Sequence, residues 1–82
     1  MGEVTRAVRL LSLFEKLMNG GIINIREEMT RYEVNEKTIR RDANDIRAYL
    51  AEIKDFEREI VYDRSKGGYV MRMKGEKKRE SR

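Results

Sequence analysis

Residues 35–42 read NEKTIRRD, and this stretch decides the fold that the sequence predicts. Asn35 is a favourable N-cap residue, because its side-chain oxygen can accept from the free amides of a first helical turn, and Glu36 complements the helix dipole. Apolar residues then follow at spacings of three and four, which is typical of a helix with one buried face: Ile39, Ala43, Ile46, Leu50 and Ile53. We therefore predict a helix over residues 35–54.

The face of this helix opposite the apolar stripe is rich in hydrogen-bond donors near its N-terminal end. These donors are Lys37, Thr38, Arg40 and Arg41. Such side chains suit a helix end that enters a DNA major groove. An ordinary solvated helix face would have a similar composition, so the neighbouring elements have to decide between the two interpretations.

A first helix is predicted over residues 4–18, followed by the helix-ending run Asn19-Gly20-Gly21. Its apolar face is broad: Val4, Ala7, Val8, Leu11, Phe14 and Met18 form one stripe, widened by Leu10, Leu13 and Leu17. We expect most of these side chains in the core. The breadth of the face also suggests that part of it contacts a second subunit or a further domain.

Between these two helices the sequence predicts a short strand and a short helix. Ile22 and Ile23 can add a minor strand to a sheet, and Asn24 can cap a helix over residues 25–32. In that helix Met29 faces the core, and we expect four charged side chains to be solvated: Arg26, Glu27, Glu28 and Arg31. Two helices joined by the short link Glu33-Val34 form a helix-turn-helix.

The C-terminal part of the chain predicts a β-hairpin. Residues 59–63 and 69–73 are rich in Ile, Val and Tyr, and the glycine-containing segment 64–68 bridges them. Arg64 and Lys66 lie at the tip of this hairpin, and Phe56 before it is expected to be buried. A hairpin after a helix-turn-helix is a wing, although an ordinary hairpin that completes the core is the plain alternative.

Composition bounds what this chain can do. Its 82 residues make one domain without Cys or His, so disulfides, thiolate or imidazole metal sites and the usual general bases are absent. We expect no enzyme, metal or cofactor. Residues 74–82 carry +3 of the net +4 and are predicted to form a basic, disordered tail. The sequence contains no membrane helix or signal peptide, so we expect a cytoplasmic protein.

Two motifs at a fixed distance give the chain a family resemblance. The helix start KTIRRD, residues 37–42, and the hairpin YDRSKGGY, residues 62–69, make residues 4–73 resemble the N-terminal winged helix-turn-helix of WYL-domain transcriptional regulators and, more loosely, DeoR-type repressors. This chain has Glu33 where the family's turn usually has Gly. It also has Ala43 where a larger aliphatic residue is usual, so Met29 is expected to fill the core beneath the helix that contains Ala43.

The resemblance implies roles for individual residues. Lys37 and Arg40 would occupy the sequence-reading positions, Thr38 and Arg41 would meet phosphates or base edges, and Asp42 would hold a neighbouring basic side chain. Tyr69 would brace the hairpin. The ligand-sensing domain that follows the wing in these families is missing here, which fits either an excised DNA-binding domain or a small free-standing regulator.

The predicted fold is therefore α+β, a winged helix-turn-helix of three helices plus a C-terminal β-hairpin wing over residues 1–73, with the tail at 74–82. The predicted function is sequence-specific binding of double-stranded DNA by a transcriptional regulator, with helix 35–54 in the major groove and wing 59–73 on the backbone or minor groove. A homodimer is expected. The alternative is a winged-helix module that binds protein without DNA. The expected DNA contacts are Asn24, Asn35, Glu36, Lys37, Thr38, Arg40, Arg41, Arg64 and Lys66.

Overall fold

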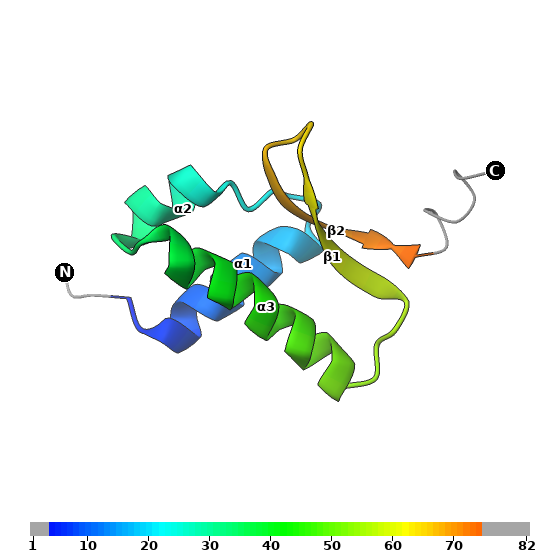
Figure 1. Cartoon of the computed structure of the whole chain (residues 1–82). Coiled ribbons are helices and arrows are strands. Elements are labelled where there is room, and N and C mark those ends of the chain that lie inside the picture. Colours follow the sequence, from blue (N-terminus) through cyan, green and yellow to red (C-terminus); the bar gives the residue numbers. More distant parts are fainter. Residues whose placement is uncertain (1–3, 75–82) are drawn as a thin grey trace.

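Three helices followed by a β-hairpin make up the protein, as the computed structural model of residues 4–74 describes it (Figure 1). In chain order the elements are α1 (Arg6–Met18), α2 (Ile25–Tyr32), α3 (Glu36–Glu52), β1 (Arg58–Asp63) and β2 (Gly68–Met73). α3 contacts α1, α2 and β1, and β2 also contacts α1. This order confirms the predicted α+β class and is consistent with a winged-helix layout. The predicted tail, apart from Lys74, lies outside the described residues.

Each helix begins at a side chain that caps it. Thr5, Asn24 and Asn35 have extended backbones, and their side-chain oxygens accept from the amides of Val8, Glu27 and Thr38, at 3.2, 2.9 and 2.9 Å. The caps predicted at Asn24 and Asn35 are thus confirmed. The predicted ends at residues 4 and 54 are slightly wrong, because Thr5 caps α1 and Lys54 adopts a left-handed φ of 60° after the helix.

The core lies where α3 packs on the other elements. Its buried members are Leu13, Leu17, Ile23, Ile39, Ala43, Ile46, Leu50, Ile60 and Tyr69. Met29 packs against this cluster, as predicted from the small side chain of Ala43. Ile53 was expected to continue the buried stripe of α3, but it is half exposed because the helix ends one residue before it.

The predicted apolar stripe of α1 is wrong in its orientation. Of the apolar residues expected in the core, Leu13 and Leu17 are buried beside Arg9, and Leu10 and Phe14 pack against the core. The rest of the predicted stripe is largely exposed: Val4, Ala7, Val8, Leu11 and Met18. Among the larger of these side chains the most exposed is Leu11, at 67%. With apolar residues almost all round the helix, periodicity could not decide which face contacts α3, and the buried face contains an arginine that no hydrophobic pattern selects.

Two further burial predictions are wrong. Glu28 was expected in solvent but is fully buried, with Lys16 Nζ 2.5 Å from one carboxylate oxygen and Arg31 Nε 3.3 Å from the other. Phe56 was expected in the core but is 60% exposed. Lys16 lies twelve residues before Glu28, and local spacing does not identify such a partner.

The two-stranded antiparallel sheet is joined to the helices by a short bridge. β1 pairs with β2 in a register that places Tyr62 opposite Tyr69. Ile23 exchanges two backbone hydrogen bonds with Tyr69, of 2.9 and 3.0 Å, and so fulfils the predicted minor strand. This bridge anchors the start of β2 beside the N-terminus of α2.

The turn between α2 and α3 requires a left-handed residue, and Glu33 supplies it with φ 56° and ψ 49°. A residue with a Cβ pays a conformational cost there that Gly avoids. We predict that Glu33→Gly raises the free energy of unfolding by about 0.5 to 1 kcal/mol in urea denaturation. Glu33→Ala removes the carboxylate but keeps the Cβ, so it should not give this gain. An equal gain from both variants would assign the effect to charge instead.

Candidate nucleic-acid interface

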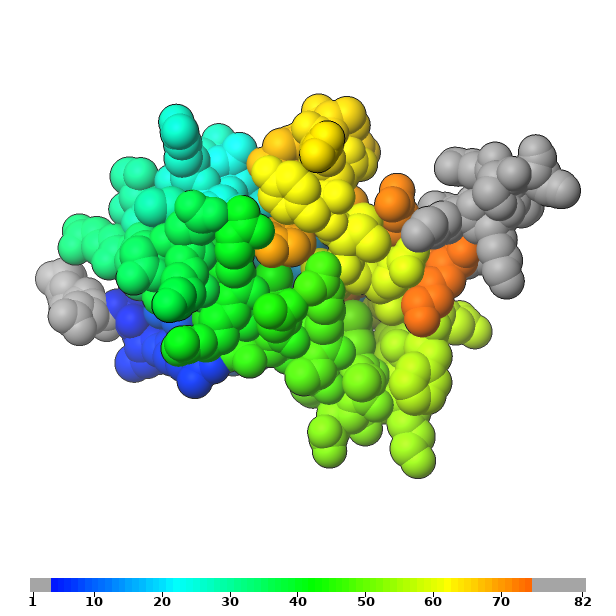
Figure 2. Space-filling view, in the orientation of Figure 1, coloured from blue at the N-terminus to red at the C-terminus, as the bar shows by residue number. Residues whose placement is uncertain are grey.

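Three segments meet on one face of the molecule: the start of α2, the first half of α3 and the hairpin. In Figure 2 the cyan surface of α2 and the yellow surface of the hairpin adjoin each other, and the green surface of α3 lies below both. A concavity of about 390 Å³ lies between them. It is lined by Asn24, Ile25, Arg26, Met29, Glu36, Arg40, Tyr62 and Gly67.

The first turns of α3 present exposed cations, of which Arg40 lines this concavity. Lys37, Arg40 and Arg41 are exposed, and Thr38 is half-buried. Their orientation is fixed by Ile39 and Ala43, which are fully buried on the opposite side of the helix. Within residues 4–74, Lys37 and Arg41 form no ion pair, so their charges are available to an external anion.

Arg40 is held by two neighbours. Its Nε and Nη2 each lie 2.8 Å from the same oxygen of Glu36, one helical turn earlier, and its Nη1 donates to the Tyr69 hydroxyl over 3.4 Å. The hydrogen bond to Glu36 is the main reason why the pKa of Arg40 is raised. Glu36 and Arg40 both line the concavity, and the sequence analysis did not predict that they are paired.

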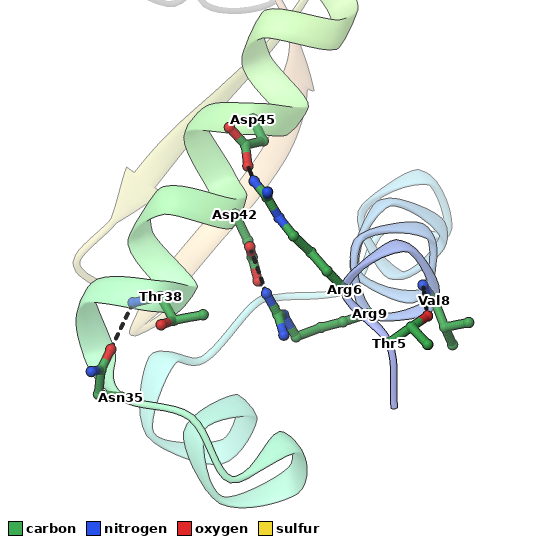
Figure 3. A network of polar contacts seen from close by, with 8 residues as sticks. All are labelled: Thr5, Arg6, Val8, Arg9, Asn35, Thr38, Asp42 and Asp45. Carbon is green, nitrogen blue, oxygen red and sulfur yellow. Dashed lines mark hydrogen bonds and ion pairs between the residues drawn. The ribbon is translucent and has the colours of Figure 1, made fainter. Parts of the chain in front are cut away.

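A buried ion pair joins α3 to α1 behind this face (Figure 3). Arg9 donates to both carboxylate oxygens of Asp42, over 2.5 and 3.1 Å, and Asp42 is fully buried. The hydrogen bond that Arg9 donates to Asp42 is the main reason why the pKa of Arg9 is raised. One turn further along α3, Arg6 forms an exposed ion pair with Asp45. Asp42 therefore holds a basic side chain, as the family resemblance implied.

Arg47 connects α3 to the hairpin, and sequence reasoning did not identify it. Its Nε and Nη2 donate to the Ile60 carbonyl over 3.0 and 2.8 Å, and its guanidinium lies 5.6 Å from the centre of the Tyr69 ring. Because its partners in the hairpin are a backbone carbonyl and a ring face, no charge pattern in the sequence indicates this contact. Arg47 and Tyr69 set the position of the hairpin relative to α3, so Tyr69 braces the hairpin as expected.

The tip of the hairpin is basic and ordered by Asp63. Arg64 and Lys66 are exposed there, and neither lines the concavity. Asp63 accepts hydrogen bonds from the Ser65 hydroxyl and from the Ser65 and Lys66 amides, over 2.7, 2.9 and 3.2 Å. The neighbouring Gly67 carbonyl accepts from the Asn24 side chain over 3.4 Å. Asn24 therefore contributes to the cap of α2 and to the placement of the tip.

The hydrogen bonds to Asp63 also predict a pH dependence. The Ser65 hydroxyl, followed by the two amides, holds the pKa of Asp63 below its ordinary value. Because the folded-state pKa is lowered, the ordering of the tip is present above the unfolded-state pKa and is lost as pH falls through the folded-state pKa. We expect the Ser65 and Lys66 amide signals in NMR to titrate with this lowered pKa. The same signals in Asp63→Asn should not follow that titration; if they do, another group is responsible.

The structure brings together predicted site residues of two segments, the start of α2 and the first half of α3. Asn24, Glu36 and Arg40 line the concavity beside Gly67 of the hairpin, while the other predicted residues lie on the surrounding surface or cap α3. Among the described residues, no group of carboxylates is placed to hold a metal ion, and no helix is long and apolar enough to cross a membrane. Comparisons with protein-family models, curated proteins and solved structures find no match for this chain.

Proposed function

We propose that this domain binds double-stranded DNA sequence-specifically, as the DNA-binding part of a transcriptional regulator. The observation that carries the proposal is the set of exposed cations at the start of α3, beside a hairpin whose tip is also basic. Lys37, Arg40 and Arg41 project from the helix, and Arg64 and Lys66 project from the tip. The first half of α3 and the hairpin tip thus offer positive charge to one polyanion.

The dimensions suit a helix in the major groove. An α-helix with its side chains is about 10–12 Å across, and the major groove of B-DNA is about 12 Å wide. With the N-terminal half of α3 in the groove, Lys37, Thr38 and Arg40 face base edges and Arg41 faces the backbone. The capped N-termini at Asn24 and Asn35 present backbone amides toward phosphates, and the hairpin lies along the backbone or the minor groove.

The experiment that tests this function is selection of bound sequences from a random duplex library at about 0.15 M salt, where nonspecific attraction is partly screened. An enriched motif is the expected result. Affinity for the selected site should fall with salt, with a log–log slope of about −0.9 for each phosphate contacted. Absence of any binding would contradict the proposal.

Two variants separate the recognition of bases from contact with the DNA backbone. Arg40→Ala should relax sequence preference, by about 5- to 150-fold at its base, because a bidentate contact to guanine discriminates by about 1–3 kcal/mol. Lys66→Ala should weaken binding to all sequences alike and reduce the salt slope by about one phosphate contact. The measurement is affinity for the selected site and for random duplex. Equal losses on both duplexes for both variants would contradict this division of roles.

A second candidate function is a protein-binding module, favoured by the exposed apolar surface of α1. Val8 and Leu11 are 51% and 67% exposed, on a helix that is expected to lie away from DNA. An interface formed by these side chains would be insensitive to salt, which distinguishes it from phosphate binding. The same surface is also the best candidate for homodimer contacts, and sedimentation at high concentration without DNA would test this.

We further propose a cytoplasmic location and a separate sensor domain for the regulator, both of which rest on the family resemblance and on the DNA-binding function.

A further inference from the structure

Arg40 has a specific set of donors left after its contacts within the protein are made. A guanidinium has five N–H donors, one on Nε and two on each terminal nitrogen. Glu36 accepts a hydrogen bond from Nε, and Nη2 lies 2.8 Å from the same Glu36 oxygen in the ion pair, while Tyr69 accepts from Nη1. Each terminal nitrogen therefore keeps at least one N–H that these hydrogen bonds do not use. A pair of donors, one on each terminal nitrogen, matches the O6 and N7 acceptors that guanine presents in the major groove.

We propose that Glu36 and Arg40 act as one guanine-reading unit, in which Arg40 donates to the base and Glu36 is a positioning residue. The inference rests on the proposed function and names guanine as the base that Arg40 contacts. Without Glu36 the arginine side chain would sample many rotamers and would lose that freedom on binding. With Glu36, the guanidinium plane is already oriented in the free protein.

The environment of the pair argues against a purely structural role. Arg40 and Glu36 have side chains that are 50% and 55% exposed, and exposed ion pairs one turn apart contribute little to helix stability. The carboxylate also carries a cost for DNA binding, because it places negative charge beside phosphates. Both groups line the concavity that faces the hairpin, where a base edge would be within reach of Arg40.

The test compares Glu36→Gln with wild type in selection from the random duplex library, together with affinity for random duplex and thermal unfolding. Glu36→Gln should lose guanine preference by about fivefold or more at the position that Arg40→Ala also relaxes, and leave the other positions unchanged. Its affinity for random duplex should rise, because one negative charge is removed. Its Tm should stay close to that of wild type.

A matched control is Glu27→Gln, which removes an exposed carboxylate from the first turn of α2 without touching Arg40. It should raise affinity for random duplex and keep the guanine preference. If Glu36→Gln keeps the guanine preference, or instead changes a preference for cytosine at another position of the motif, Glu36 does not position Arg40. In that case the inference fails, while the proposed DNA reading stands. If wild type enriches no motif, both the inference and the proposed function fail.

Discussion

Asp42→Ala should lower the free energy of unfolding by about 3 to 5 kcal/mol, which is a large share of the stability of a domain of this size. Asp42 is fully buried, and its carboxylate accepts two hydrogen bonds from Arg9. Removing it leaves a guanidinium inside the protein, between α1 and α3, without its counter-charge. The cost is mainly that of the uncompensated charge, because the attraction itself only offsets the desolvation of the pair.

Urea denaturation followed by circular dichroism measures this loss, and Asp45→Ala is the matched control. Asp45 pairs with Arg6 on the next turn of α3, but that pair is exposed, so its removal should cost less than about 1 kcal/mol. The double variant Arg9→Met, Asp42→Leu should recover most of the stability, since it removes both charges. Similar losses from Asp42→Ala and Asp45→Ala would show that burial does not determine the effect.

Under the proposed function the buried pair has a further role, because it holds α3 on α1. Arg9 and Asp42 hold the first half of α3 on α1, while Arg47 holds its middle against the Ile60 carbonyl of β1. Together these contacts set the distance between the cations at the start of α3 and the hairpin tip. A DNA reader needs this distance to be constant, because one segment lies in a groove while the other follows the adjacent backbone.

Local signals in the sequence predicted the elements well. Asn24 and Asn35 mark helix starts through hydrogen bonds to residues three positions later, and Gly67 supplies the positive φ of 75° in the hairpin turn. These interactions involve neighbours in sequence, so residue type and spacing are sufficient to find them. The exposed positions of Lys37 and Arg41 were predicted for the same reason, as they lie opposite the apolar stripe of α3.

Partners distant in sequence account for what could not be predicted. Glu28 is buried because Lys16 of α1 reaches it, and Arg9 because Asp42 of α3 does. Neither position looks apolar, so a hydrophobic pattern assigns both to solvent. Arg47 remained unnoticed because it binds a backbone carbonyl, which has no signature in the sequence. The orientation of α1 depends on these polar contacts, so the prediction of which face it buries was wrong.

Gly68→Ala should cost about 3 kcal/mol or more, through overpacking and the loss of two hydrogen bonds. A Cβ at Gly68 would lie 2.2 Å from the Ile23 carbonyl oxygen and 2.8 Å from its carbon. Backbone atoms cannot rotate away as a flexible side chain can, so β2 must separate from Ile23. The exchange of hydrogen bonds between Ile23 and Tyr69 would then break.

Gly20→Ala is the control that separates sterics from backbone conformation. Gly20 has a φ of +82°, and a Cβ there would meet nothing within 4 Å, so only the cost of the left-handed conformation applies, about 1 kcal/mol. In thermal unfolding, the Tm of Gly68→Ala should be well below the Tm of Gly20→Ala. Displacement of β2 also moves Tyr69 away from Arg40 and Arg47, so the folded fraction of Gly68→Ala should lose guanine preference as well as affinity. If that fraction keeps the preference, the hairpin does not help to position Arg40, and Glu36 alone is sufficient.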